Sequence, residues 1–254
     1  MSAAITSVCL TVRMPTTSGR AQGVRARARA QMRTEILDAA RRELAAEGAA
    51  ALALRAVARE GGMVSSAIYR YFDNRDALLT ALIIDAYDSL GAAVEAAEAR
   101  VPRSDLPGRW QTIAESVRSW ALDNPSLYAL VYGSPVPGYA APADTVGPAT
   151  RVTRLLAALI QDAPPGDGVA TEAGPRVGDL SAGAVDGLAP LVEFIGPGTT
   201  EDRAVAGLMA WTWLFGAVSF ELFGQLTGAV APERREAVFA AEAQRAAGWL
   251  GLTP

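Results

Sequence analysis

Apolar residues recur three and four positions apart along most of this 254-residue chain, whereas the alternation of apolar and polar residues that is typical of strands is hard to find. Glycine and proline gather between these periodic stretches rather than inside them. Because a spacing of three and four places side chains on one face of a helix, the sequence predicts an all-α fold. Half of the residues are hydrophobic, which is enough for a sizeable core.

The charged residues are divided unevenly along the chain. All 23 basic residues are arginine, and the net charge is −4. Up to residue 75 there are 12 arginines and 6 acidic residues, whereas the remainder holds 11 arginines and 21 acidic residues. A basic region followed by an acidic one is typical of a domain that meets a polyanion, attached to a domain that does not.

Several classes of active site are excluded by composition. Histidine is absent, and the single cysteine is Cys9, so the sequence holds no disulfide, no nucleophile paired with histidine and no histidine-ligated metal. It also lacks a glycine-rich phosphate loop and a metal-ligand motif. We therefore expect no enzymatic activity, no cofactor and no metal, and a location in the reducing cytoplasm.

The stretch LALRAVAREGGMVSSAIYRYF, residues 52–72, predicts two short helices joined by a turn at Gly61 and Gly62. In the second helix, at about 64–72, Ile68 and Phe72 lie four apart on the buried side. Four side chains then form a small outer face that can make hydrogen bonds: Ser65, Ser66, Tyr69 and Arg70. Such a face is typical of a helix that enters a DNA groove.

The chain divides into three predicted regions. Residues 1–30 hold arginines without acidic residues and without apolar periodicity, and we interpret them as a flexible, Arg-rich arm that either contacts DNA or is a solvated tail. Residues 31–76 form a three-helix, helix-turn-helix DNA-binding domain. Residues 77–254 form a larger helical domain for effector binding and dimerisation.

Within these domains, apolar spacing predicts a sequence of helices. The helix after Asn74 has two apolar rows and is the expected mechanical link between the domains. The longest helix, 201–226, is apolar nearly all round, so it lies in a core, in a subunit interface or in a membrane. The absence of a flanking basic belt disfavours the membrane. The other predicted helices span 31–47, 109–122, 126–132, 148–161, 180–195 and 232–250.

Residues 36–82, ILDAARRELAAEGAAALALRAVAREGGMVSSAIYRYFDNRDALLTAL, resemble the N-terminal domain of tetracycline-repressor (TetR) family transcriptional regulators. PSLYALVYGSPVPGYAAP at 125–142 and WTWLFGAVSFELFG at 211–224 resemble the ligand domain of a TetR subfamily with a Trp-His-Gly-type motif, in which Phe215 here replaces the histidine. The resemblance implies a homodimeric regulator, a repressor that binds a palindromic operator and is released by a small apolar or aromatic effector.

The resemblance and the residue types together indicate three sets of site residues. The DNA-binding set comprises Arg33, Arg55, Ser65, Ser66, Tyr69, Arg70, Tyr71 and Arg75, among which the family pattern assigns phosphate contacts to Tyr69, Tyr71 and Arg75. The effector-binding set comprises Trp120, Tyr128, Tyr132, Trp211, Phe215 and Glu221, although plain core packing is the more frequent role for each of these residues. The dimer-interface set comprises Leu222, Leu226, Val238, Phe239 and Trp249, with Val205 and Leu208.

The sequence also departs from the family pattern. Ala53 and Val64 stand where the family places a serine or threonine that caps each helix, and Gly61 replaces a larger apolar residue. Loss of a good N-cap costs about 1 kcal/mol, so either Ser65 caps a helix that starts one residue late or this two-helix unit, residues 52–72, is locally looser. We call this unit the reading head and expect it to be marginally ordered without DNA. Two alternatives remain at this point: a DNA-binding dimer without an effector, and a helical membrane-associated protein. The expected partners are duplex DNA, a second copy of the chain and a small effector, with no membrane.

Overall fold

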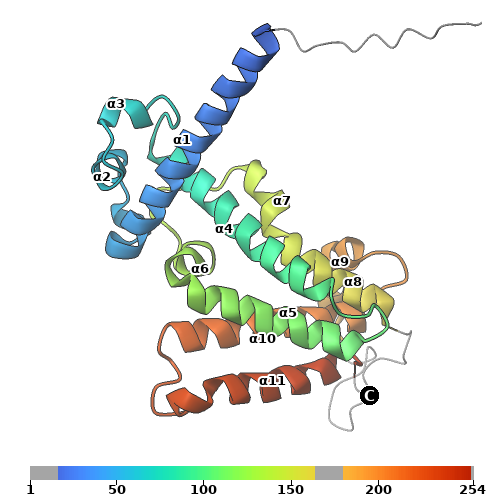
Figure 1. The fold of residues 1–254 in the computed structure, drawn as a ribbon. Helices are drawn as coiled ribbons and strands as arrows, with labels where there is room; N and C mark the ends of the chain where they lie inside the picture. The colour runs from blue at the N-terminus through green and yellow to red at the C-terminus, as the bar shows by residue number, and fades with distance from the viewer. Residues whose placement is uncertain (1–16, 164–179, 253–254) are drawn as a thin grey trace, which may run out of the picture.

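The computed structural model describes residues 17–163 and 180–252, with side chains from residue 24 onward. Within these ranges all regular structure is helical and no strand occurs, which confirms the all-α prediction. Figure 1 shows a small N-terminal unit on one side of a larger bundle of helices.

The N-terminal unit is built from α1 (Thr17–Glu47), the short helix η1 (Ala49–Ala51), α2 (Leu54–Glu60) and α3 (Ser65–Ile68). Helices α2 and α3 lie beside α1, away from the C-terminal helices (Figure 1). The core of the unit is fully apolar and consists of Ile36, Leu44, Leu52, Val57, Ile68 and Phe72, each at most 3% exposed.

Residues 17–30, which belong to the predicted flexible arm, are helical in the structure. Helix α1 begins at Thr17 and continues without a break through residue 30, whereas residues 1–16 lie outside the described region. Alanine and arginine are strong helix formers, so this segment is helical although it has no apolar stripe. The guanidinium groups of Arg29 and Arg33 also lie over the rings of Tyr71 and Phe72, at 5.6 and 4.7 Å from the ring centroids.

Helix α4 (Arg75–Glu98) is the central element, and α1, α5 (Leu106–Asp123), α6 (Pro125–Tyr132), α7 (Val146–Ala149) and α8 (Arg151–Asp162) pack against it. Asn74 caps it by accepting a hydrogen bond from the Ala77 amide at 2.9 Å, so of the two caps that the sequence offers, Asp73 and Asn74, the structure uses Asn74. Both of its predicted apolar rows are at least partly buried, so α4 contacts the N-terminal unit and the bundle at once.

The bundle is completed by η2 (Ala143–Thr145), α9 (Ala182–Ile195), α10 (Glu201–Leu222), η4 (Pro232–Arg234) and α11 (Arg235–Trp249). Several predicted helix boundaries differ from the observed ones. The helix at 148–161 is divided at Thr150 into α7 and α8, and α10 ends at Leu222 rather than at 226. Helix α5 begins at Leu106 because Asp105 caps it and a proline is tolerated in a first turn.

Two helices, α4 and α10, are long and apolar enough to cross a membrane by length and composition alone. Packing explains the apolar character of α4, because five helices cover it. Helix α10 is covered less completely, and Met209, Phe220 and Phe223 on it are 43%, 57% and 46% exposed.

An ionic clamp joins α4 to α8. The Arg151 guanidinium donates to Glu95 at 2.8 and 2.5 Å, and to the carbonyl and carboxylate oxygens of Asp88 at 2.9 and 3.0 Å. The hydrogen bond from Arg151, together with its charge, lowers the pKa of Glu95, so the clamp stays ionised at neutral pH. The arginine crosses α4 at Gly91, where an added Cβ would lie 2.6–2.8 Å from its side chain.

Replacing Gly91 by alanine is expected to displace Arg151 and to lower the free energy of unfolding by about 1–3 kcal/mol, because the helices cannot keep their spacing. Gly187→Ala on α9 is the matched control, since nothing lies within 4 Å of its added Cβ, and it should stabilise the protein by about 0.5–1 kcal/mol. Urea unfolding measures both changes. Equal effects of the two substitutions would contradict the assignment of Gly91 to this close crossing.

Candidate functional site

The outer face of α3 and the turn after it is exposed. Ser65, Ser66, Tyr69 and Arg70 all face solvent, with Tyr69 48% exposed, while Ile68 beneath them is fully buried. The helix is shorter than the predicted 64–72, because regular α-helix ends at Ile68 and residues 69–71 form a turn. The Tyr71 and Phe72 amides donate to the Ile68 carbonyl at 2.8 and 3.0 Å, which returns Phe72 to the core before Asn74 begins α4.

Both helices of the reading head lack a side-chain N-cap, as the sequence predicts. The cap positions are occupied by Ala53 and Val64, which have extended backbones and no side-chain oxygen that could accept a hydrogen bond from the helix. Ser65 does not replace the missing cap, because it is already the first helical residue. The Met63 side chain fills the space that the usual larger residue at position 61 would occupy. Its Cε lies 2.3 Å from the position of a Cβ added to Gly61.

Three predicted DNA contacts already have partners within the protein. Arg75 donates to the carbonyl oxygens of Leu52, Ala49 and Ala50 at 3.0, 2.9 and 3.2 Å, which fixes the turn that precedes α2. Arg33 and Tyr71 take part in the cation–π contacts that hold α1 against the head. Sequence reasoning predicted none of these internal roles. Arg55, by contrast, is exposed on α2.

The predicted effector residues do not line one cavity. The ring of Tyr132 packs between the rings of Tyr128 and Phe215, and its centroid lies 5.0 Å from that of Tyr128 and 4.3 Å from that of Phe215. The Tyr87 ring meets it edge-on, with the centroids 5.9 Å apart. The Tyr128 hydroxyl donates to the Phe215 carbonyl at 2.9 Å. Burial raises the pKa of both Tyr128 and Tyr132, so their phenols are neutral. These rings form a packed, uncharged cluster that joins α4, α6 and α10.

Two other predicted effector residues have internal partners. The Trp120 indole donates to the Ser89 hydroxyl at 3.0 Å. Glu221 is 8% exposed and accepts two hydrogen bonds from Arg118, each 2.7 Å long. The carboxylate predicted to contact an effector is therefore neutralised within the chain.

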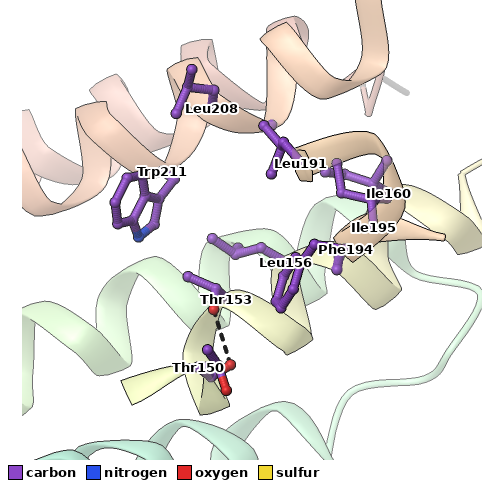
Figure 2. Close-up of a pocket in the computed structure, with 11 residues that line it drawn as sticks. Thr150, Thr153, Leu156, Ile160, Leu191, Phe194, Ile195, Leu208 and Trp211 are labelled. Atoms are coloured by element: carbon purple, nitrogen blue, oxygen red, sulfur yellow. Dashed lines mark hydrogen bonds between the residues drawn. The ribbon is translucent and has the colours of Figure 1, made fainter. Parts of the chain in front are cut away.

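Trp211 is the predicted residue that lines a cavity between α8, α9 and α10 (Figure 2). The volume of this cavity is about 220 Å³, and Leu156, Phe194 and Leu208 contribute to its walls. Sequence reasoning missed these three as ligand contacts, because on their own helices they are ordinary members of apolar stripes.

The predicted dimer residues fall into two groups. Phe239 is 4% exposed and stacks on Trp213 at 5.5 Å, and Leu222 and Trp249 pack against the same core. Leu226 and Val238 instead line an open groove of about 310 Å³ between α10 and α11, next to the exposed Phe220.

Family comparisons agree with this arrangement. The model described as bacterial regulatory proteins, tetR family, matches residues 36–82, which contain the reading head. The model described as tetracyclin repressor-like, C-terminal domain, matches residues 110–246, which contain both the cavity and the groove. The chain belongs to the TetR family of transcriptional regulators.

Individual relatives of this TetR-family chain share most of its length. It is 42% identical over 215 residues to the HTH-type transcriptional regulator Rv1816 of Mycobacterium tuberculosis and to Mb1846 of Mycobacterium bovis, covering 80% of this chain and 86% of each relative. The crystal structure of SCO4313 is 34% identical, with a TM-score of 0.68 over 88% of this chain and 98% of that one. The protein is thus a transcriptional regulator with a DNA-binding domain, and not an enzyme.

Replacing Val64 by threonine is expected to raise the free energy of unfolding by about 1 kcal/mol, because the hydroxyl can cap α3 from a residue already in the extended conformation. Val64→Ala is the control, since it shortens the same exposed side chain without adding an oxygen. Urea unfolding gives the stability, and amide hydrogen exchange at residues 65–68 should slow only in the threonine variant. Strong protection of these amides in the unmodified, DNA-free protein would contradict the marginal order that we expect for the head.

Proposed function

We propose that this TetR-family regulator is a homodimeric repressor that binds a palindromic operator through residues 65–75 and leaves it when a small molecule binds the C-terminal domain. One observation carries the DNA contact: the only groups on the outer face of α3 and its turn are two hydroxyls, a phenol and a guanidinium, all exposed. Arginine reads guanine edges, and hydroxyls position the protein on phosphates. The family resemblance supports the repressor assignment, and the presence of a single cysteine supports a cytoplasmic location.

The charge of the reading head also supports a DNA contact. Arg55 and Arg70 are exposed on α2 and after α3, and the exposed Arg25 and Arg27 lie on the N-terminal part of α1. Arg75 holds the head together through Nε and one terminal nitrogen, while Nη1 has only a 3.8 Å ion pair with Asp76. We propose that Nη1 contacts a phosphate of the operator.

The surface of α10 supports dimerisation. Met209, Gly216, Phe220 and Phe223 follow one another at intervals of three to seven along one side of the helix, and the three large side chains are 43–57% exposed. A stripe of this kind is unusual on a monomer and marks an interaction surface. We propose that α10 and α11 pair with the same helices of a second copy, which would present two heads about 34 Å apart, one turn of DNA.

An unsatisfied donor lies beside this stripe. Among the described residues, Arg235 Nε is buried and has no hydrogen-bond partner, and Arg235 lines the groove between α10 and α11. Buried donors without a partner are rare in folded proteins. A second copy that packs on α10 and α11 would supply the missing acceptor.

Operator binding should depend on salt through the arginines of the head. Each lost phosphate contact lowers the magnitude of the slope of log K against log salt by about 0.9. We expect this change for Arg70→Gln and for Arg75→Gln, measured by fluorescence anisotropy on DNA selected from a random pool. Arg100→Gln, an exposed arginine beyond the end of α4, is the control and should leave the slope unchanged. An unchanged slope in Arg75→Gln, with the fold intact, would limit Arg75 to its internal role.

Replacing Phe220 by glutamate is expected to convert the dimer to a monomer at micromolar concentration and to weaken operator binding by at least about tenfold, because a carboxylate would be buried without a partner. Leu122→Glu adds the same charge at a 40% exposed apolar residue on α5, away from the stripe, and should remain a dimer. Light scattering after size exclusion measures the mass. A monomer in the unmodified protein would reject the mechanism with two half-sites.

A further inference from the structure

The cavity between α8, α9 and α10 has the size of a small ligand. Its walls come from three helices, and Figure 2 shows side chains from each of them around the same space: Thr153, Leu156 and Ile160 from α8, Leu191, Phe194 and Ile195 from α9, and Leu208 and Trp211 from α10, with Thr150 at the N-cap of α8. The volume is about 220 Å³. An apolar cavity of about 150 Å³ accepts benzene, so this cavity has room for a substituted single ring or a branched hydrocarbon of similar size.

The polar groups of the lining restrict the chemistry of the ligand. Thr150 and Thr153 carry the only side-chain polar atoms among the lining residues, apart from the Trp211 indole. The Thr150 hydroxyl donates to the Gly147 carbonyl at 2.9 Å, and the Thr153 hydroxyl donates to the Thr150 carbonyl at 3.0 Å. Because both hydroxyl hydrogens are engaged, the threonine oxygens face a ligand as acceptors.

A charged ligand has no counter-charge in this cavity. None of the lining residues is ionisable under ordinary conditions. Arg203, at the start of α10, is engaged by the carbonyl oxygens of Ile160 and Ala163. The cavity is open to solvent on one side, since Phe194, Leu208 and Trp211 in its lining are 40%, 38% and 38% exposed. A carboxylate or phosphate bound among these side chains would still lose part of its hydration without gaining a partner of opposite charge. The matching ligand is therefore uncharged and apolar, with room for one hydrogen-bond donor directed at the threonines.

The cavity is connected to α4 by two sets of contacts. Arg151, which clamps α8 to α4, lies in the sequence between the cavity residues Thr150 and Thr153. On the other wall, a chain of aromatic contacts leads from Trp211 to α4. The ring centroids of Trp211 and Phe215 are 6.2 Å apart, and those of Phe215 and Tyr132 are 4.3 Å apart. Tyr132 in turn contacts the ring of Tyr87 on α4 at 5.9 Å. A ligand that pushes α8 away from α10 therefore acts on α4 from two sides.

We propose that this cavity binds a small, uncharged, apolar molecule bearing at most one hydrogen-bond donor, and that its occupancy repositions α4 through Arg151. The inference rests on the proposed function for its regulatory meaning, since α4 carries the reading head through the Arg41–Asp85 ion pair with α1. The binding step itself can be measured without DNA.

Binding is tested with toluene, phenol and benzoate on the full-length protein. Toluene and neutral phenol should bind saturably in calorimetry and raise the melting temperature by at least about 2 °C at ten times Kd. Benzoate, with the same ring and a negative charge, should do neither. Saturable benzoate binding as tight as that of toluene, or no binding of either neutral probe, would overturn the proposal.

Two substitutions locate the binding to this cavity. Ala157→Leu fills it from α8 and should weaken toluene binding by at least about tenfold, whereas Ala158→Leu, on the same helix but not in the lining, should leave it unchanged. Thr153→Val keeps the shape and removes the acceptor, so phenol should bind about five- to tenfold more weakly while toluene is unaffected. Equal effects of Ala157→Leu and Ala158→Leu, or an equal loss of both probes in Thr153→Val, would place the binding elsewhere.

Transmission is tested by hydrogen exchange along α4. Toluene should change the exchange of the amides at 79–95 in the unmodified protein, and Arg151→Gln should abolish that change without preventing toluene from binding. An undiminished change in Arg151→Gln would reject the clamp as the connection. Dissociation of the dimer by toluene, seen in light scattering, would instead identify the occupant as a side chain of a second copy.

These results separate the inference from the proposed function. Ala157→Leu should still bind operator DNA with unchanged affinity, because the reading head is untouched. If this variant and the unmodified protein both bind DNA and neither binds toluene, the cavity proposal fails alone. If toluene binds and no DNA sequence is selected, the proposed operator function fails while the ligand site stands.

Discussion

The structure depends on the packing of five other helices against α4. A single helix of 24 residues is contacted by α1 from the reading head and by α5, α6, α7 and α8 from the bundle. Because close-packed helices rearrange as units rather than deform continuously, no neighbour of α4 can move far without moving the others. The two domains of this TetR-family regulator thus share one core, and their relative orientation is set by the packing on this helix.

The ion pairs within the bundle set the spacing between helices and do not form a polar pocket. Arg151 spans α8 and α4, Arg118 binds Glu221 of α10, and the nearly buried Arg109 binds Glu98 and Asp162 at 2.5 and 2.7 Å. Removing one partner of a buried pair leaves a buried charge, which is far more costly than the pair is favourable. Each arginine therefore fixes a distance between two helices, and the cavity between α8, α9 and α10 is left without ionisable groups.

The elements with strong local signals were predictable from sequence. Asn74 as the cap of α4, the glycine turn at 61–62 and the missing caps at Ala53 and Val64 all follow from the chemistry of single residues. The helical class followed from spacing. What could not be predicted depends on partners distant in the chain: Arg75 bound to the carbonyls before α2, Glu221 paired with Arg118, and a cavity whose walls come from three separate segments between residues 150 and 211. Aromatic residues were chosen as ligand contacts by type, yet Tyr128, Tyr132 and Phe215 fill space between helices instead.

Helix α1 extends well beyond the buried core of the N-terminal unit. A helix rises about 1.5 Å per residue, so the exposed Val24 lies about 18 Å along the axis from the buried Ile36. Any rotation of the reading head is magnified in proportion to that length, and a turn of about 10° carries the free part of the helix sideways by about 3 Å. Arg25 and Arg29, four residues apart on one side of the helix, and Arg27 on the opposite side travel with it. The direction of these charges therefore changes whenever α4 shifts.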